Sequence, residues 1–280
     1  MYIQDLHLEI TRNCTIECEH CLRGDKCIVN MSLDILDEIF NNVKHVGSLL
    51  LTGGEPLIAI QVIERLIEIL KIGKVTVREV KIITNGTVFG KRIIESLTEL
   101  SKLTILIFRV SDNIFHQLEL DRLKLRDKRD YNLEVMRSLN INWNFADNFG
   151  REEENSNMSK GLLKLGRAAR LTQKRLDGIN AISKQKYTFT PYIDKHPYTV
   201  VDGDSVIGNI TIDVYGNIVT YSRPFIDEDR EAEKTKLNIM KMPFRDAVCD
   251  FVASSHIITE DFYKNQASYD SKNKKELSLK

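Results

Sequence analysis

Two hydrophobic patterns alternate along the chain. Short runs of apolar residues are separated by longer segments in which apolar residues recur every three or four positions. Runs of the first kind predict buried strands, and segments of the second kind predict amphipathic helices. Strands that alternate with helices favour an α/β fold with a parallel sheet, here an open barrel or half barrel rather than a sandwich. The strands are expected at residues 6–11, 47–51, 80–84, 105–111, 141–145 and within 207–219.

Capping and stop residues place the helices between these strands. Ser32 is expected to cap the first helix, and Pro56 stands near the first turn of the second, which Gly73 ends. Further helices are expected around residues 93–100 and 133–139. Tyr215-Gly216-Asn217 predicts a hairpin turn within the last strand segment.

Composition and charge limit the partners. The chain has 280 residues, 42% of them hydrophobic, which suffices for one sizeable core. With 40 basic and 40 acidic residues the formal net charge is zero, so nucleic acid binding is not indicated. No stretch of ~18 apolar residues predicts a membrane span. Because residues 1–10 carry acidic residues instead of a basic and apolar leader, we expect a cytoplasmic protein.

The most informative polar residues are Cys14, Cys18 and Cys21, which have the spacing CxxxCxxC. Cys27 and Cys249 are isolated, so a disulfide framework is not favoured, and a thiol cluster in a reducing compartment is more often metal-binding or catalytic. Iron–sulfur clusters normally use four cysteines, so three thiolates leave one position open for a ligand that is not protein. Zinc is the alternative for this spacing, although no fourth zinc ligand is obvious.

Polar motifs follow three further strands at their carboxyl ends. Gly53-Gly54-Glu55-Pro56 comes after the second strand, Asn85-Gly86 after the third and Ser111-Asp112 after the fourth. Barrel enzymes carry their active sites on this rim, so these segments and the cysteines are expected to converge on one face. Glycine carbonyls and the Glu55 carboxylate suit a ligand ammonium group, whereas a phosphate requires N–H donors and a lysine, which this loop lacks.

Together these motifs resemble those of the radical S-adenosylmethionine (SAM) superfamily over roughly residues 5–220. The resemblance implies a partial (β/α)6 TIM-like barrel at residues 1–222 and a short C-terminal extension at residues 223–280. The Lys-rich and Ser-rich composition of residues 264–280 predicts that this end of the extension is disordered, with a cap on the barrel as the alternative. It also implies that the three cysteines hold one 4Fe-4S cluster, whose open iron binds the amino and carboxylate groups of SAM. The implied SAM contacts are His20 near the adenine, Gly53, Gly54 and Glu55 at the amino group, Asn85, Ser111 and Asp112 at the strand ends, and Arg167 in a GRA segment.

The resemblance implies a reaction class. An electron donor such as flavodoxin or ferredoxin would reduce the oxygen-sensitive cluster, SAM would be cleaved, and a 5′-deoxyadenosyl radical would remove a substrate hydrogen. We expect a peptide or protein substrate, with a small molecule such as a nucleoside, lipid or cofactor precursor as the alternative. A non-catalytic iron–sulfur sensor is the alternative from another class. His116, in an SDxFH-like stretch, is the candidate catalytic residue, with a structural histidine as the competing interpretation.

Two later segments bear on these expectations. Residues 215–222 and 237–239 resemble the SPASM or twitch extension of peptide-modifying radical SAM enzymes, but the expected cysteines are missing, so a single cluster is expected. Between Ser159 and Arg175 six basic residues occur without an acidic one. A solvated helix face is the default prediction for these basic residues, and contact with the SAM carboxylate or an anionic substrate is the alternative.

Overall fold

The computed structural model describes residues 1–139, 143–146, 160–163, 166–190, 199–219 and 237–253. Its main sheet contains β1 (Tyr2–Thr11), β2 (His45–Gly53), β3 (Thr76–Thr84), β4 (Ile105–Val110), β5 (Trp143–Ala146), β8 (Val200–Asp202), β9 (Ser205–Ile212) and β10 (Ile218–Val219). The strand order is β10-β9-β1-β2-β3-β4-β5, with β8 paired to β9. Strands β1 to β5 and β9 run parallel, whereas β8 and β10 are antiparallel to β9. Within the described residues β5 and β10 do not pair, so the barrel is open.

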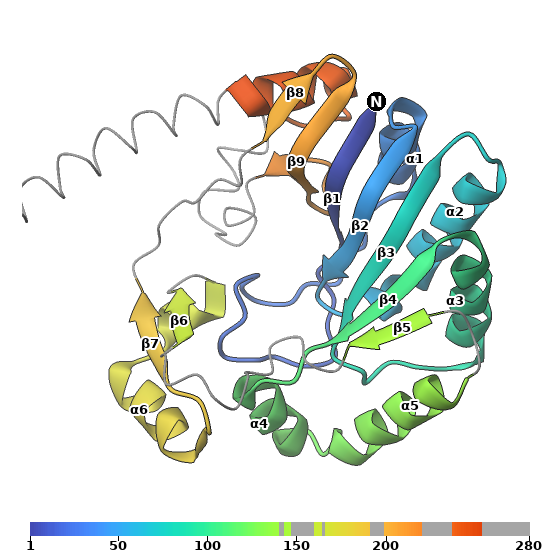
Figure 1. Ribbon diagram of the computed structural model, residues 1–280. Coiled ribbons are helices and arrows are strands. Elements are labelled where there is room, and N and C mark those ends of the chain that lie inside the picture. Colours follow the sequence, from blue (N-terminus) through green and yellow to red (C-terminus); the bar gives the residue numbers. More distant parts are fainter. Residues whose placement is uncertain (140–142, 147–159, 164–165, 191–198, 220–236, 254–280) are drawn as a thin grey trace, which may run out of the picture.

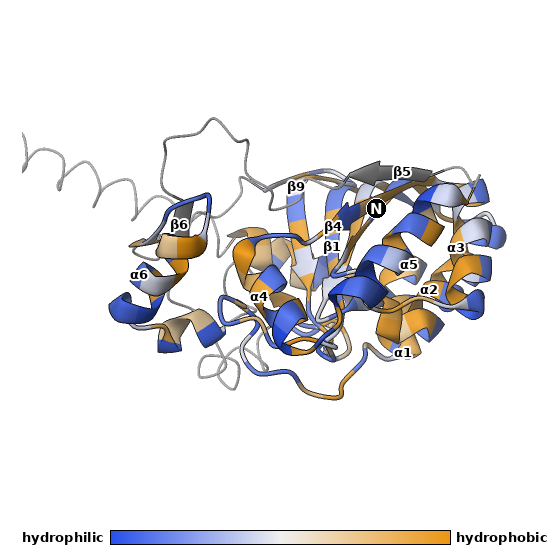
Figure 2. Ribbon diagram, turned by 90° about the horizontal axis from the view of Figure 1, so that it is seen from below, coloured by the Kyte–Doolittle hydropathy of each residue, from blue (hydrophilic) through white to orange (hydrophobic). Residues whose placement is uncertain are grey.

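Helices cover one side of this sheet, as Figure 1 shows. They are α1 (Leu33–Asn42), α2 (Ile60–Lys71), α3 (Lys91–Leu103) and α5 (Arg126–Ser138), with the 3-10 turn η1 (Pro56–Ala59) before α2. Helix α4 (Ile114–Arg122) lies beyond the end of the sheet, and its buried Phe115 and Leu120 belong to a separate hydrophobic cluster. Hydrophilic residues lie along the outer edges of α2 and α3 in Figure 2. The amphipathic helices therefore turn their apolar sides to the sheet.

One hydrophobic core lies between the sheet and these helices. Leu8, Leu49 and Ile82 of adjacent strands are fully buried there, together with Leu36 of α1 and Ile63 of α2. Each such side chain contributes about 1.5–3 kcal/mol on leaving water. Residues 244–253 are helical and add buried side chains to the same core. The rest of the expected C-terminal extension, at residues 223–236 and 254–280, lies outside the described residues.

A smaller unit lies beside the loop that follows β1. It contains β6 (Lys160–Leu163), η2 (Gly166–Arg170), α6 (Gln173–Ile182) and β7 (Tyr187–Thr190), and β6 pairs in parallel with β7. Its buried Ala168 and Leu176 form a second hydrophobic cluster with Cys18 of the loop and Phe115 of α4. In Figure 1 the loop at residues 12–31 runs between this unit and the carboxyl ends of β1 to β4.

The predicted α/β class and open barrel are confirmed, with differences in detail. The last predicted strand segment is the β9–β10 hairpin, and β9 lies beside β1 on the side opposite β2. Helix α4 lies outside the ranges predicted from apolar periodicity, because its buried residues Phe115, Glu119 and Leu120 do not follow a simple apolar helical pattern. Glu119 is tolerated there since its carboxylate pairs with Arg122 at 2.7 Å.

The side of the sheet without these helices is polar. His7 lies between the buried core residues Leu6 and Leu8, so it points to this concave face. Lys81 of β3 donates to Ser48 at 2.9 Å and lies 2.6 Å from the Glu79 carboxylate. Burial, with the charges of Lys81 and Arg23, lowers the pKa of His7 to about 4, so its ring is neutral near pH 7. The concave face therefore presents hydrogen-bonding groups and paired charges.

Candidate metal and cofactor site

The loop at residues 12–31 brings three cysteines to one cavity. The cavity has a volume of about 280 Å³, and Cys14, Cys18 and Cys21 all line it. All three thiols are free, with Cys18 buried and the other two half-buried. Burial raises the pKa of the Cys14 thiol to about 11 and also raises the pKa of Cys18. A bound metal overcomes this cost because its positive charge stabilises the thiolate.

Three thiols at one cavity can supply three of the four thiolate positions of an iron–sulfur cluster. In a cluster each thiolate binds its own iron, so the sulfurs need not meet at one point. Among the residues that the structure describes, no three His, Cys, Asp or Glu side chains are arranged around a single metal ion. The thiols therefore fit a cluster in their chemistry, with one coordination position left for a ligand that is not protein.

Gly53 and Gly54, at the end of β2, pack against the start of the loop at residues 12–31, which is called the cysteine loop below. A Cβ on Gly53 would lie 2.1 Å from the Thr11 carbonyl oxygen, and one on Gly54 would lie 2.1 Å from that of Asn13. The N–H groups of Gly54 and Glu55 donate to these carbonyls of Thr11 and Asn13, each at 2.8 Å. Both glycines line the cavity. The close approach that requires glycine is made by the protein's own backbone.

Glu55 joins the loop after β2 to the end of β3. Its side chain is fully buried and is not among the residues that line the cavity. Oε1 accepts from the Thr84 hydroxyl at 2.8 Å and from the Leu57 N–H at 3.2 Å, and Oε2 accepts from the Asn85 N–H at 2.7 Å. Burial raises the pKa of the carboxyl to about 7, against the opposing effect of these hydrogen bonds.

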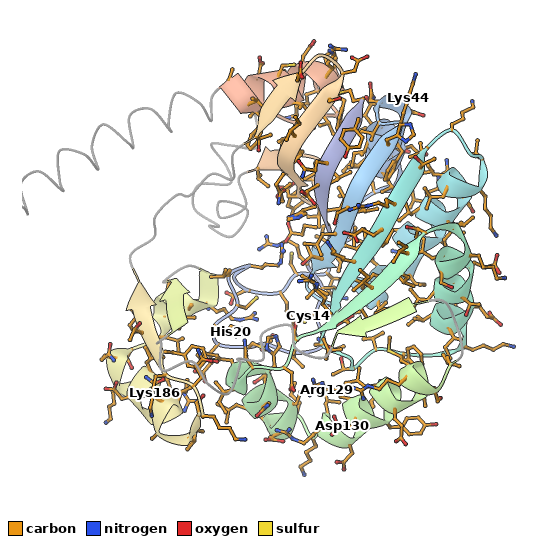
Figure 3. All side chains as sticks on the ribbon, viewed as in Figure 1. Cys14, His20, Lys44, Arg129, Asp130 and Lys186 are labelled. Atoms are coloured by element: carbon orange, nitrogen blue, oxygen red, sulfur yellow. The ribbon has the colours of Figure 1, made fainter. Side chains whose placement is uncertain are left out.

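The polar residues after β3 and β4 are divided between the cavity and the interior. Asn85 and Ser111 line the cavity, whereas Asp112 does not. Asp112 instead lies 2.9 Å from the Arg129 guanidinium of α5, and both side chains are only 5% exposed. Figure 3 shows Arg129 on this helix. A buried pair of this kind fixes the loop after β4, because removing one partner leaves an uncompensated charge.

Two histidines lie side by side at the cavity, joined by Asn113. Asn113 Nδ2 is 3.0 Å from His20 Nε2, and its Oδ1 is 2.8 Å from His116 Nδ1. The His20 ring stacks on Phe115 with centroids 4.6 Å apart, and Figure 3 shows His20 near Cys14. Burial lowers the pKa of His116 to about 4 and that of His20 well below its usual value, so both rings are neutral near pH 7. His20 Nδ1 is buried and has no hydrogen-bond partner among the described residues.

Arg167 of the smaller unit contacts the cysteine loop on the side opposite the main sheet. Its N–H donates to the Cys21 carbonyl at 2.9 Å, and its Nε donates to the Cys18 carbonyl at 2.9 Å. The preceding Gly166 has a φ of +54°, and a Cβ there would lie 2.5 Å from the Leu22 carbonyl oxygen. Arg167 also lines the cavity, so it places a positive charge beside the cysteines.

Two further arginines of the same unit pair with acidic residues of the cysteine loop. Arg170 lies 2.7 Å from the Asp25 carboxylate, and Arg175 lies 2.8 Å from that of Glu19. The sequence did not identify these pairs, since about 145 residues separate the partners in the first pair. Part of the basic segment thus contacts the cysteine loop while remaining exposed to solvent.

Sequence reasoning also missed a charged group at the cavity wall. Arg12, Arg23 and Thr52 line the cavity. Arg23 lies 2.7 Å from the fully buried Glu9 carboxylate and donates to the Thr52 hydroxyl at 3.2 Å. The sequence contains no clear signal for it, because Glu9 alternates with the apolar Leu8 and Ile10 as a residue of the polar face would. Once buried, its carboxylate requires a partner.

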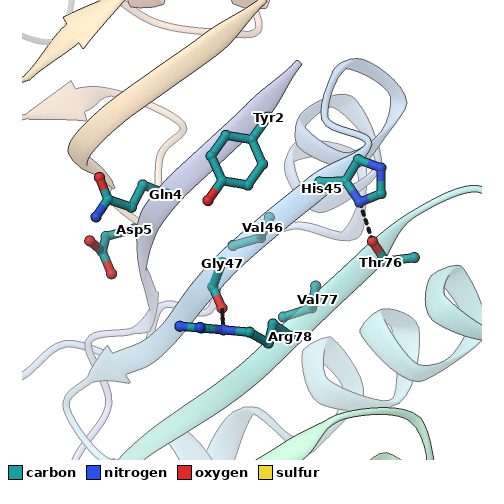
Figure 4. Close-up of a pocket in the computed structure, with 9 residues that line it drawn as sticks. All are labelled: Tyr2, Gln4, Asp5, His45, Val46, Gly47, Thr76, Val77 and Arg78. Atoms are coloured by element: carbon teal, nitrogen blue, oxygen red, sulfur yellow. Dashed lines mark hydrogen bonds between the residues drawn. The ribbon is translucent and has the colours of Figure 1, made fainter.

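A second cavity lies at the other end of the strands, near the amino ends of β1 to β3. Its volume is about 400 Å³, and Figure 4 shows the residues that line it. Its polar side chains are those of Tyr2, Gln4, Asp5, His45, Thr76 and Arg78. The His45 ring is hydrogen-bonded to Thr76 across β2 and β3. Cavities thus occur near both ends of these strands.

One known protein family matches the part of the chain that forms most of this site. Residues 8–146 match the family model described as the radical SAM superfamily. This segment includes β1 to β5, the three cysteines and the polar ends of β2, β3 and β4. Through it the chain belongs to the radical SAM superfamily, a family of enzymes whose membership implies an iron–sulfur cluster and SAM. No curated protein matches the chain.

Solved structures show more distant similarity. The chain is similar to anSMEcpe, solved with bound AdoMet and the Cp18Cys peptide, with a TM-score of 0.41, 19% identity and coverage of 52% of this chain and 42% of that chain. It is also similar to Streptococcus suis SuiB bound to the precursor peptide SuiA, with a TM-score of 0.38, 14% identity and coverage of 88% of this chain and 64% of that chain. The chain therefore spans about two fifths to two thirds of their lengths. In the described part of the chain, none of the helices has the length and apolar character needed to cross a membrane.

Proposed function

We propose that Cys14, Cys18 and Cys21 hold one 4Fe-4S cluster and that the adjoining cavity binds SAM. The observation that carries this proposal is the meeting of three thiols with the polar ends of β2, β3 and β4 in one cavity. Bound there, the two groups supply the reductive cleavage of SAM to a 5′-deoxyadenosyl radical, with a low-potential donor such as flavodoxin or ferredoxin as the electron source. The 1–222 core and 223–280 extension belong to the same proposal.

Some side chains are proposed to contact SAM directly, and others to hold the contacting residues in position. We assign direct SAM contacts to the cavity-lining residues His20, Gly53, Gly54, Asn85, Ser111 and Arg167. Glu55 and Asp112 act from behind the cavity, because their carboxylates are occupied by β3 and by Arg129 respectively. His116 is assigned a catalytic contact: its Nδ1 proton is held by Asn113, which leaves the neutral Nε2 as an acceptor toward the cavity.

The substrate is proposed to be a peptide or protein segment. The polar concave face extends along β1, whose ten residues span about 30 Å. An extended peptide can lie along such a face and use its backbone groups as hydrogen-bond partners. Paired charges such as Lys81 and Glu79 disfavour a lipid chain on the same surface, because an apolar chain would cover them without replacing their hydration.

Anaerobic reconstitution with iron and sulfide tests this proposal. With dithionite and SAM, the protein should form 5′-deoxyadenosine and methionine in step with its iron content, as measured by mass spectrometry. Cys18→Ala should abolish this formation, and Cys249→Ala, which removes an isolated thiol, should retain it. A protein that takes up zinc and leaves SAM intact would show that the cysteines were misread, and turnover of a small molecule in place of peptides would replace the proposed substrate.

A further inference from the structure

Asn85 makes a contact that its expected role at the SAM site does not explain. Its side-chain nitrogen Nδ2 lies 3.6 Å from Cys14 Sγ, within hydrogen-bond range for sulfur, and 3.1 Å from the Thr15 hydroxyl oxygen. The residue is only 5% exposed. Asn85 therefore offers a largely desolvated donor to one of the three cysteine sulfurs.

The orientation of this amide is fixed by its oxygen. Asn85 Oδ1 accepts from the Thr87 N–H at 2.9 Å and from the Thr87 hydroxyl at 2.6 Å. Turning the amide over would place its NH₂ group against the Thr87 N–H, which can only donate, and would put the oxygen toward the sulfur. The hydrogen-bond pattern thus selects the arrangement in which nitrogen faces Cys14.

The backbone beneath the amide is fixed as well. The Asn85 N–H donates to Glu55 Oε2 at 2.7 Å, and Thr84 donates its hydroxyl to Oε1 of the same carboxylate at 2.8 Å. Gly86 in turn donates its N–H to the Thr84 hydroxyl oxygen at 2.9 Å. The buried glutamate after β2 therefore sets the position from which Asn85 reaches the sulfur.

We propose that Asn85 is a positioning residue that donates an N–H···S hydrogen bond to Cys14 and raises the reduction potential of the cluster. This inference rests on the proposed function, which places the cluster on Cys14. A reduced cluster carries one more negative charge than the oxidised form, and this charge is shared with the cysteine sulfurs. A donor to a sulfur stabilises the reduced form more, and hydrogen bonds of this kind help to set cluster potentials.

The expected size of the effect follows from one neutral hydrogen bond. Its loss should lower the ratio of reduced to oxidised cluster at a fixed potential roughly fivefold. At 59 mV per tenfold for a one-electron couple, this corresponds to a shift of about 40 mV to more negative potential. The Ile16 backbone N–H also bonds to Cys14 and is unaffected, so the cysteine keeps one donor.

A potentiometric titration of the reconstituted cluster, followed by electron paramagnetic resonance without SAM, measures this shift. Asn85→Ala should lower the potential as described. Asn85→Asp keeps an oxygen for Thr87 but replaces the donor by an anion, so it should lower the potential further. Asn42→Ala is the matched control: it removes an asparagine amide that bonds Glu38 at the end of α1, outside the cavity, and should leave the potential unchanged.

The outcomes separate this inference from the proposed function. A wild-type protein that assembles no 4Fe-4S cluster refutes the proposed function. A loaded cluster whose potential is the same in the wild type and in both Asn85 variants overturns the inference alone. If the variants fold or load poorly, the wild type labelled with ¹⁵N at the asparagine side chain decides the matter. A ¹⁵N hyperfine coupling to the reduced cluster supports the hydrogen bond, and its absence overturns it.

Discussion

The cysteine loop is held by two walls of different construction. The sheet-side wall consists of Gly53, Gly54 and the Glu55–Asn85 pair, which meet the loop through backbone contacts and buried hydrogen bonds. The arginine-side wall consists of Arg167, Arg170 and Arg175 in the smaller unit. The sheet-side wall depends on shape and burial, which tolerate little change. Much of the arginine-side wall depends on exposed charges, which water and salt weaken.

Gly54→Ala is expected to have the largest effect, because it breaks the sheet-side wall. The new Cβ would lie 2.1 Å from the Asn13 carbonyl oxygen, so the start of the cysteine loop would have to shift. We expect a loss of about 3 kcal/mol in the free energy of unfolding, together with loss of iron loading. Denaturant unfolding of the apoprotein and iron analysis measure the two effects.

The control for this change is Gly178→Ala in α6. A Cβ at Gly178 meets nothing within 4 Å. Alanine is the better helix former, so this variant should gain up to about 1 kcal/mol and load iron normally. If Gly54→Ala and Gly178→Ala were equally stable, the close packing of the sheet-side wall would be contradicted.

Glu55 makes the sheet-side wall sensitive to pH. Its carboxyl pKa is raised from 4.5 to about 7, so over this range the folded protein keeps a proton that the unfolded chain has released. Stability from this group is therefore greatest below pH 4.5 and falls as the pH rises to about 7. Glu55→Gln should remove on the order of 3 kcal/mol of this dependence.

Unfolding free energies of the apoprotein at about pH 5 and about pH 8 measure the difference. Glu55→Gln also replaces one acceptor by an NH₂ group that faces the Asn85 N–H, so its absolute stability should fall. The comparison therefore uses the pH dependence, not the stability at one pH. Glu134→Gln, on the exposed side of α5, should keep the wild-type dependence. An unchanged dependence in Glu55→Gln would mean that another group causes it.

The two walls differ in how far the sequence predicted them. Strand ends in a parallel sheet lie along one edge, so the convergence of Gly53, Gly54 and Asn85 on the cysteines followed from the order of the elements. The sequence also indicated a carboxylate at Glu55, but residue type does not give side-chain direction. The structure buries that carboxylate under β3, where it binds the protein instead of lining the cavity.

Pattern analysis could not predict the contacts that form the arginine-side wall. The basic residues of the segment 159–175 were visible as a charge run, but a charge run does not specify its partners. Asp25 and Glu19 lie in a loop without regular periodicity, and nothing local links them to Arg170 or Arg175. Apolar periodicity did not predict helix α4 for a related reason, since Glu119 occupies a buried position that pattern analysis assigns to an apolar residue.

Arg167→Ala tests the strongest contact of the arginine-side wall. It removes the Nε donor to the Cys18 carbonyl but leaves the backbone bond to Cys21. We expect a loss of about 2 kcal/mol in unfolding free energy, since a charged donor is removed from a part-buried carbonyl, and several-fold slower iron loading. Arg167→Lys should recover only part of this loss because it lacks the guanidinium geometry. Lys174→Ala, an exposed change in the same segment, should match the wild type; a similar loss there would contradict a specific role for Arg167.

The smallest expected effect belongs to the exposed pair of Arg170 and Asp25. The two side chains are 68% and 60% exposed, so water screens their attraction although the geometry is bidentate. A double-mutant cycle with Arg170→Ala and Asp25→Ala should give a coupling below about 1 kcal/mol that declines as salt is added. The same cycle on Arg175 and Glu19, which are 50% and 44% exposed, provides the comparison. A coupling of several kcal/mol that resists salt would show that this wall, like the sheet side, is held by desolvated contacts, and the distinction between the two walls would fail.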